Sequence, residues 1–136
     1  MNRVTEHTGS KYPIIQAPMG WIARSQLASA VCNAGGFGVI ETSSGEVDNC
    51  KAEIEKMSNL TDQPFGVNLP LLFLRDETMV EFCVKHGVKF VTTSAGDPNK
   101  YCADLKDAGL KLKDLKTEQS NLEKIFVSLV RENNEI

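Results

Sequence analysis

The sequence of 136 residues lacks the features that mark several classes of protein. Its 15 basic residues are scattered among 18 acidic ones, which argues against nucleic-acid binding because a phosphate backbone requires a clustered positive face. The longest uncharged apolar stretch, Val67 to Leu74, is too short to cross a bilayer. The polar segment from Met1 to Tyr12 contains no apolar core of a secretory signal. We therefore expect a cytoplasmic protein that binds neither nucleic acid nor membrane.

The sequence also lacks a pair of closely spaced cysteines. Its cysteines, which are far apart, are Cys32, Cys50, Cys83 and Cys102. Without a CxxC pair, the spacing predicts neither a zinc site nor dithiol exchange, and we assign no metal ligand. Lys85 and His86 lie near Cys83, but this spacing is a weak indication of a reactive thiol. We interpret the cysteines as small, buried side chains in a reducing compartment.

What the sequence does contain is a repeated pattern of a short β-rich run, a polar turn, a helical stretch and a glycine. The pattern predicts strands over Ile14–Pro18, Phe37–Glu41, Phe65–Leu69 and Val88–Thr93. It predicts helices over Ser25–Ala34, Glu46–Met57, Asp76–His86 and Asn99–Ala108. We expect Ser25 and Asp76 to cap their helices, and Ser58-Asn59 to end the second one.

Strands that alternate with helices of this length predict parallel pairing through right-handed crossovers, and hence an α/β fold. Periodicity alone does not distinguish an open, doubly wound sheet from a closed barrel. No glycine-rich phosphate motif follows a strand, since Gly35-Gly36-Phe37-Gly38 precedes one, and this disfavours an open-sheet nucleotide binder. After residue 111 the pattern changes, and an apolar stripe predicts an amphipathic helix that contains Leu122, Ile125, Phe126, Leu129 and Val130.

Unusual residues follow three of the predicted strands. These junctions are Gln16 to Trp21, Asn68 to Pro70, and Thr93 to Pro98. Ligands of parallel α/β folds bind at the carboxyl ends of the strands, so all three junctions are expected to line one mouth. Proline and glycine shape the first junction, and the Asn68 amide offers both a donor and an acceptor to a heteroaromatic ring.

The motifs at these junctions resemble those of the nitronate monooxygenase family, formerly called 2-nitropropane dioxygenases. The motifs are PIIQAPMG, AGGFGVI, FGVNLP and FVTTSAGDP, in the order and spacing of that family. The family also includes flavin-type enoyl-acyl-carrier-protein reductases. The resemblance extends from Tyr12 to about Lys111.

This resemblance implies a TIM (β/α)8 barrel that holds FMN at its mouth. The positions that it assigns to cofactor binding are Ala17, Pro18, Met19, Gly20, Asn68, Thr93 and Ser94. Backbone groups of the first segment would contact the isoalloxazine ring, and Asn68 would bond to the polar edge of the ring or to the ribityl chain. The implied reaction is the oxidation of alkyl nitronates, with the reduction of enoyl thioesters as an alternative, so the substrate is a small molecule.

The sequence departs from the family pattern in its second half. Family members continue through four more βα units, which supply the loops around the FMN phosphate and a catalytic histidine. Neither His7 nor His86 fits that role, so we assign no catalytic residue. We therefore expect residues 1–111 to form about four βα units, the N-terminal half of the barrel, and residues 112–136 to form a divergent helical tail. The sequence leaves open whether this tail is native, frameshifted or fused.

Two functional interpretations follow from this partial barrel. The first is an FMN-dependent oxidoreductase that is weakly active or inactive alone. The second is a non-catalytic half-barrel that associates with a second copy or with a separate C-terminal half. Four parallel strands without closure leave two open sheet edges and an uncovered apolar interior, which favour association.

Overall fold

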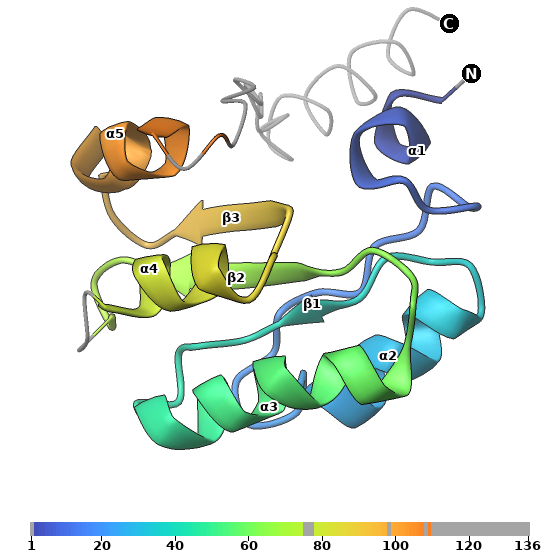
Figure 1. The fold of residues 1–136 in the computed structure, drawn as a ribbon, viewed down its shortest axis with the longest axis horizontal. Coiled ribbons are helices and arrows are strands. Elements are labelled where there is room, and N and C mark those ends of the chain that lie inside the picture. The colour runs from blue at the N-terminus through green and yellow to red at the C-terminus, as the bar shows by residue number, and fades with distance from the viewer. Residues whose placement is uncertain (1, 75–77, 98, 108, 110–136) are drawn as a thin grey trace, which may run out of the picture.

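The structure, a computed structural model, describes residues 2–74, 78–97, 99–107 and 109, and its fold is α/β (Figure 1). Three strands form a parallel sheet in the order β1 (Val39–Ile40), β2 (Gly66–Pro70) and β3 (Phe90–Ser94). The helices are α1 (Arg3–Thr8), α2 (Ser25–Asn33), α3 (Val47–Leu60), α4 (Thr78–Lys85) and α5 (Asn99–Asp107). The predicted parallel α/β arrangement is confirmed. The predicted helical tail, residues 112–136, lies outside the described residues.

The first predicted strand, Ile14–Pro18, is reduced to a single parallel bridge between Ile15 and Phe37. The Phe37 N–H donates to the Ile14 carbonyl at 2.9 Å, and the Gln16 N–H donates to the Phe37 carbonyl at 2.9 Å. The Gln16 side chain then continues the pairing, because its amide accepts from the Val39 N–H at 3.2 Å and donates to the Val39 carbonyl at 3.1 Å. The segment therefore lies at the edge of the sheet beside β1, although it is not a regular strand.

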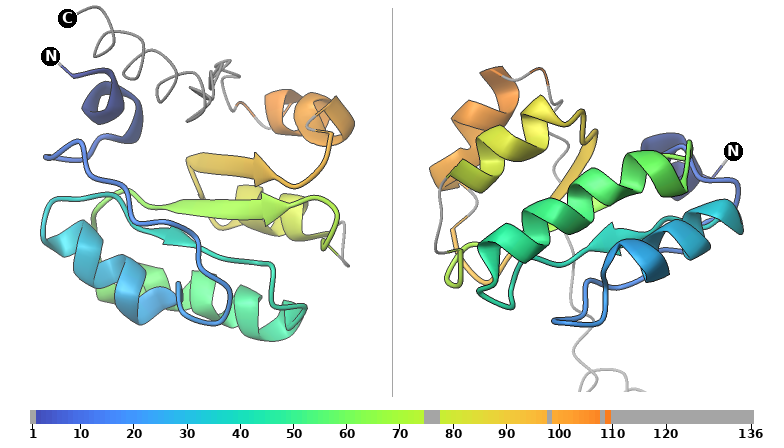
Figure 2. Two further views of the ribbon diagram at one scale, coloured as in Figure 1. Left: turned by 180° about the vertical axis from the view of Figure 1, so that it is seen from behind. Right: turned by 60° about the horizontal axis from the view of Figure 1, so that its bottom comes forward.

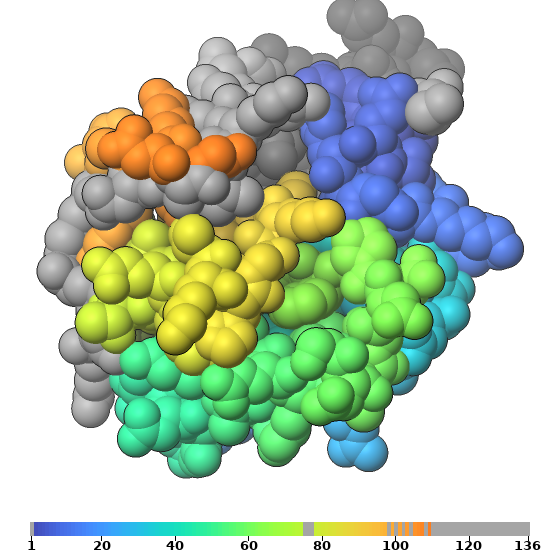
Figure 3. Space-filling view, viewed as in Figure 1, coloured from blue at the N-terminus to red at the C-terminus, as the bar shows by residue number. Residues whose placement is uncertain are grey.

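The helices α2 to α5 form a row along one side of the strands (Figure 2). Alternation along β2 directs Val67 and Leu69 toward these helices, where they join the hydrophobic core. The rest of the core comes mainly from the inward faces of the helices and includes Ala28, Cys32, Ile54, Met57, Val80, Cys83 and Leu105. The space-filling view in Figure 3 shows α3 and α4 packed side by side over this layer. Among the described residues, no helix is long and apolar enough to cross a membrane.

Aromatic packing occupies the amino-terminal part of the opposite sheet face. The rings of Phe37 and Phe90 meet edge to face, with 5.0 Å between their centroids. Gly66 lies beneath them, and a Cβ atom at this position would approach the Phe37 ring to 2.9 Å. A side chain at position 66 would therefore disrupt this ring contact.

Several helix boundaries differ from the predictions. Ser25 is the first residue of α2 and not its cap, because the N-cap position is Arg24 and the Ser25 N–H donates to the Glu53 carboxylate of α3 at 2.9 Å. Helix α3 continues through Ser58 and Asn59 to Leu60, since its buried face extends to Met57 and one further turn completes the hydrogen bonds. The prediction of a cap at Asp76 lies outside the described residues.

Helix α1 is absent from the sequence-based prediction, because its six residues show no apolar stripe. It begins where the Asn2 side chain accepts a hydrogen bond from the Val4 N–H at 2.9 Å, and it ends at Gly9, which has a φ of 74°. A Cβ atom at Gly9 would lie 3.3 Å from Pro64, which precedes β2. Helix α1 therefore lies at the amino-terminal edge of the sheet, away from the predicted mouth.

Candidate functional site

The loops at the carboxyl edge of the sheet contain the unusual backbone geometry of the molecule. Two non-glycine residues among the described ones have a positive φ: Trp21, at 59°, and Ala95, at 50°. Trp21 follows the first strand segment and Ala95 follows β3. A non-glycine residue in this conformation is strained by roughly 1–3 kcal/mol, and such strain is concentrated at functional sites. The carboxyl edge is therefore the candidate site on geometric grounds as well as by its sequence.

The predicted flavin-contacting segment, Ala17 to Gly20, lies in the loop between the first strand segment and α2. Ala17, Pro18 and Met19 are exposed, and Gly20 is partly buried. A Cβ atom at Gly20 would lie 3.3 Å from the Ser43 Oγ atom in the loop after β1. Glycine thus allows the first two loops to lie close together, while the three residues before it are exposed.

Asn68 lies in β2, and its side chain is on the sheet face opposite the helices. It is 6% exposed, and its Oδ1 atom accepts a hydrogen bond from the Thr92 hydroxyl at 2.9 Å. Its Nδ2 atom donates to the Ser94 Oγ atom at 3.1 Å. A side-chain amide has two N–H groups, and the bond to Ser94 uses one of them. The second N–H group and the exposed Ser94 hydroxyl are suited to the polar edge of a heteroaromatic ring.

The structure separates the two hydroxyl residues that were predicted at the end of β3. Ser94 is opposite Pro70 and shares the sheet face of Asn68, whereas Thr93 is opposite Leu69 and shares the face toward the helices. Thr92, which is opposite Asn68, contacts the amide through its hydroxyl, as Ser94 does. Sequence reasoning missed Thr92, although the two-residue alternation of a strand would have grouped it with Ser94.

The loops after β2 and β3 are also joined to each other. The Leu71 N–H donates to the Ser94 carbonyl at 2.8 Å, and the Leu72 N–H donates to the Ala95 carbonyl at 2.8 Å. The second of these bonds continues the pairing past the end of β2 and β3, to Ala95, and the Ser94 side chain lies beside Asn68. Asn68, Thr92 and Ser94 are therefore held together by both side chains and backbone.

Sequence reasoning also missed Glu41, which ends the run that contains β1. Its side chain is fully buried, and its carboxylate forms an ion pair with Arg24, with 3.0 Å between Oε1 and Nε. The same carboxylate accepts hydrogen bonds from the N–H groups of Trp21, Ser43 and Ser44. A charged residue directly after an apolar run was the available signal, because such a residue is rarely buried unless it is paired.

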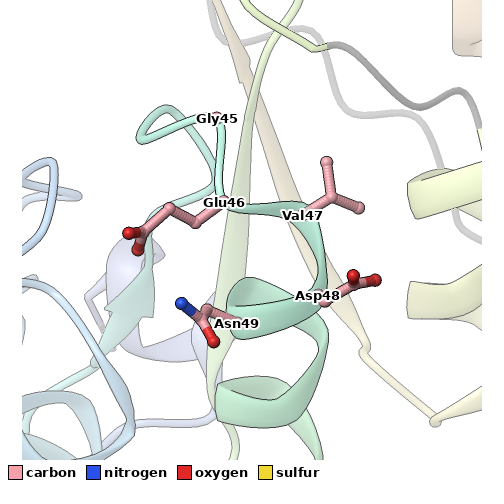
Figure 4. A pocket seen from close by; sticks show the side chains of 5 residues that line it. All are labelled: Gly45, Glu46, Val47, Asp48 and Asn49. Carbon is pink, nitrogen blue, oxygen red and sulfur yellow. The ribbon is translucent and has the colours of Figure 1, made fainter.

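A shallow depression lies at the start of α3, and Figure 4 shows the residues that line it, which are Gly45, Glu46, Val47, Asp48 and Asn49. Two of them carry carboxylates, and Glu46 is paired with Arg24 at 2.9 Å. A helix N-terminus attracts anions, but the two carboxylates make this one unfavourable for a phosphate group. The depression therefore adds no phosphate-binding group to the candidate site.

The histidines, Cys32 and Cys83 lie outside this site, whereas the Cys50 Sγ atom is 3.6 Å from the Ser44 Oγ atom and 3.9 Å from an Arg24 nitrogen. His86 follows α4, where its ring stacks on Phe82 with 4.1 Å between centroids, and His7 lies in α1 at the opposite edge of the sheet. Cys32, Cys50 and Cys83 are buried free thiols, as predicted, and burial raises the pKa of Cys83 to about 12. Three or more potential metal ligands do not come together anywhere in the described part of the chain.

The family model for nitronate monooxygenase matches residues 2–80, which is more than half of the chain. A nitronate monooxygenase of Pseudomonas aeruginosa is 44% identical over 68 residues, which cover 50% of this chain and 19% of that protein. The (3aS,4S,5R,7aS)-5-hydroxy-7a-methyl-1-oxo-octahydro-1H-indene-4-carboxyl-CoA dehydrogenase of Mycobacterium tuberculosis is 35% identical over 106 residues. That alignment covers 78% of this chain and 30% of the relative.

Solved structures agree with the sequence relatives. FabK from Thermotoga maritima has a TM-score of 0.75 and 36% identity, over 82% of this chain and 36% of the FabK chain. Nitroalkane oxidase from Streptomyces ansochromogenes has a TM-score of 0.62 and 27% identity, over 78% of this chain and 40% of that one. The parallel βα units thus match part of the TIM barrel of these proteins, and the chain spans well under half of their length. The chain belongs to the nitronate monooxygenase family of flavin-dependent oxidoreductases.

Proposed function

We propose that this chain forms one side of an FMN site in an oxidoreductase of the nitronate monooxygenase type. The observation that carries the proposal is the shared position of the open Ala17–Gly20 loop and the Asn68–Ser94 pair at the carboxyl edge of the sheet, in a chain of this family. TIM-barrel enzymes build their active sites at this edge.

The chemistry of the residues fits the ring system of a flavin. The exposed segment Ala17 to Met19 offers peptide groups to a flat ring, other than the Ala17 and Met19 carbonyls, which accept hydrogen bonds within the loop. Asn68 and Ser94 offer an N–H and a hydroxyl to the polar edge of the ring. The flavin itself would supply electron or hydride transfer through its N5 atom. The protein residues supply position and hydrogen bonds. Thr93 would lie beside the cofactor only through its backbone, because its side chain is directed toward the helices.

Titration of the purified chain with FMN, followed by flavin fluorescence, tests this proposal. We expect saturable quenching that is weakened about 10-fold by Asn68→Leu, since a lost hydrogen bond at a buried polar site costs about 1–3 kcal/mol. Leu60→Ala is the matched control, because Leu60 is exposed at the end of α3 and lies away from the carboxyl edge. Quenching that is absent in the wild type, or equal in wild type and Asn68→Leu, would contradict the proposed site.

The reaction that we propose is the oxidation of alkyl nitronates, and reduction of an enoyl thioester is the alternative. Relatives with different named activities share this fold, so family membership does not select the substrate. Because the matched residues cover 19% of the Pseudomonas aeruginosa nitronate monooxygenase and 30% of the Mycobacterium tuberculosis relative, we expect little or no turnover from this chain alone. Oxygen uptake with propyl-2-nitronate measures this, and a rate comparable to that of a full-length relative would contradict it.

A second candidate function is association of a non-catalytic half-barrel with a second copy or with a separate C-terminal half. The observation that favours it is an exposed apolar edge in the first strand segment, where Ile14 is 63% exposed and Ile15 is 48% exposed. Large apolar side chains on an open sheet edge favour pairing. Sedimentation velocity tests this candidate: a concentration-dependent dimer would support it, and a monomer with cooperative unfolding would oppose it.

A further inference from the structure

Glu41 is a fully buried carboxylate that the proposed function leaves without a role. It lies just after β1, at the same edge of the sheet as the candidate site, and it contacts both loops that follow the first strand segment and β1. One Oε atom is 3.2 Å from the Trp21 nitrogen and 3.0 Å from the Arg24 Nε atom. The other accepts from the N–H groups of Ser43 at 2.7 Å and Ser44 at 3.0 Å.

These contacts are all made by donors. The Ser43 hydroxyl adds a further contact to the same carboxylate, at 3.0 Å. A carboxylate only accepts hydrogen bonds, whereas a side-chain amide of the same size would turn an NH2 group toward some of these donors. The surroundings therefore specify glutamate, and neither glutamine nor an apolar residue satisfies them.

The contacts of Glu41 fix the loop that carries the proposed flavin-contacting backbone. Trp21 has a φ of 59°, a strained conformation that persists only when its surroundings hold it. Its N–H bond to Glu41 is one restraint, and the bonds from the Ile22 and Ala23 N–H groups to the Met19 carbonyl, at 3.1 and 2.8 Å, close the turn. The Ala23 carbonyl in turn accepts from the Glu41 N–H at 3.0 Å. The turn is thus attached to residue 41 through both side chain and backbone.

We propose that Glu41 is a positioning residue of the flavin site, which rests on the proposed function. Its carboxylate, neutralised by Arg24, holds the Trp21 turn in its strained conformation, so that the backbone from Ala17 to Gly20 faces the ligand. A supporting residue of this kind sets the orientation of the groups that contact a ligand without touching the ligand itself.

The variant Glu41→Gln tests this assignment, and Glu53→Gln is its matched control. Glu53 is also a partly shielded carboxylate that binds the start of α2, where it accepts hydrogen bonds from the N–H and hydroxyl groups of Ser25. Among the described residues, Glu53 bonds to Ser25 and Lys56 and not to the turn at Trp21. A role limited to holding α2 in place would therefore affect both variants alike, whereas a positioning role distinguishes them.

Two readouts are measured on the full chain at a temperature where each variant is folded. The chain contains a single tryptophan, so near-ultraviolet circular dichroism and acrylamide quenching of the indole report on the Trp21 turn without any ligand. FMN titration reports on the site. For Glu41→Gln we expect a changed Trp21 signal and a loss of FMN affinity of about 10-fold or more, the size seen when supporting residues are lost. For Glu53→Gln we expect both readouts to stay within about 2-fold of wild type.

Glu41→Asp is the conservative variant and also serves if Glu41→Gln does not fold. Aspartate keeps an acceptor-only carboxylate, so we expect it to restore part of the FMN affinity and of the Trp21 signal. Unchanged Trp21 signal and FMN affinity in Glu41→Gln, or equal losses in Glu53→Gln, would overturn the assignment. Absence of FMN binding in the wild type would instead overturn the proposed function, while the Trp21 signal would still show whether Glu41 holds the turn.

Discussion

Glu41 and Asn68 are buried polar side chains at the same edge of the sheet, but they differ in the partners that they contact. Glu41 brings together donors from two loops and an arginine, whereas Asn68 contacts two hydroxyl groups of the neighbouring strand. A buried charge requires a complete set of partners, but a neutral amide with one N–H group still available tolerates an incomplete set. Glu41 is therefore suited to fixing loops, and Asn68 is suited to contacting a ligand.

Arg24→Met is expected to have the largest effect, because it leaves the Glu41 carboxylate buried without a counter-charge. Loss of one partner of a buried ion pair costs about 3–5 kcal/mol, which we expect as a reduced free energy of unfolding in urea. The double variant Arg24→Met/Glu41→Gln is the control, and it should recover part of the loss because it removes the isolated charge and keeps an acceptor oxygen for some of the surrounding N–H groups. A loss below about 1 kcal/mol in Arg24→Met would show that the buried charge of Glu41 does not require its partners more than the neutral amide of Asn68 does.

Asn68→Leu is expected to have a smaller effect on stability, of about 1–3 kcal/mol, because the residue is neutral and its partners are hydroxyl groups. Urea unfolding of this variant, of Thr92→Val and of the double variant measures the coupling between the two side chains. We expect the double variant to lose less than the sum of the single losses. A loss in Asn68→Leu as large as that in Arg24→Met would show that Glu41 and Asn68 depend equally on their partners.

Ser43→Ala separates the contribution of a side-chain donor to Glu41 from that of the backbone donors. The variant removes one hydroxyl from Glu41 and keeps the backbone N–H at 2.7 Å, so we expect a loss of about 0.5–1.5 kcal/mol in the free energy of unfolding. Ser58→Ala is the control, since its hydroxyl bonds to a carbonyl within α3 on an exposed surface. Equal and negligible losses in both variants would mean that the backbone donors alone satisfy Glu41.

The smallest expected change in the free energy of unfolding comes from Glu53, and it is expected only at acidic pH. Burial opposes ionisation of Glu53, but the Lys56 ammonium and the hydrogen bonds from Ser25 outweigh it and lower its pKa to about 2, from an ordinary 4.5. A carboxyl whose pKa is depressed on folding stabilises the fold above its unfolded pKa and loses this contribution as the pH falls through the folded value. We therefore expect the stability advantage of wild type over Glu53→Gln to shrink between pH 4.5 and about 2.

Urea unfolding of wild type and Glu53→Gln at several pH values in this range measures that advantage. Lys56→Met is the control, because it removes one of the groups that lower the pKa and should make the pH dependence shallower. An advantage that stays constant down to about pH 2 would indicate that the Glu53 contacts are not kept in solution.

The repeating βα elements of the fold could be predicted from the sequence. The helices α2, α4 and α5, each of which precedes a glycine, were predicted within a few residues, because periodic apolar positions and helix-ending glycines such as Gly35, with a φ of 93°, are local signals. The cap of α2 was wrong because Glu53, which is far along the chain, competes for Ser25. The first strand was wrong in extent because regular pairing ends at Gln16.

The candidate site was predictable by position and less so by side-chain contact. Motif order placed Ala17 to Gly20, Asn68 and Ser94 at one edge, where the structure has them. Which face Thr93 occupies depends on the register with β2, and the set of Glu41 partners depends on loops that approach only in three dimensions. Whether these residues hold FMN stays a prediction.

The side chain of Gln16 also explains how the sheet edge accommodates Pro18. If the first strand continued, the next backbone donor to the Val39 carbonyl would be the nitrogen of Pro18, which carries no hydrogen. The Gln16 amide serves as a substitute peptide group there, with its oxygen and nitrogen bonded to the two polar groups of Val39. Gln16 and Pro18 therefore act together. The proline ends the main-chain pairing with β1, and the Gln16 side chain satisfies the N–H and carbonyl groups of Val39 that this pairing would otherwise have used.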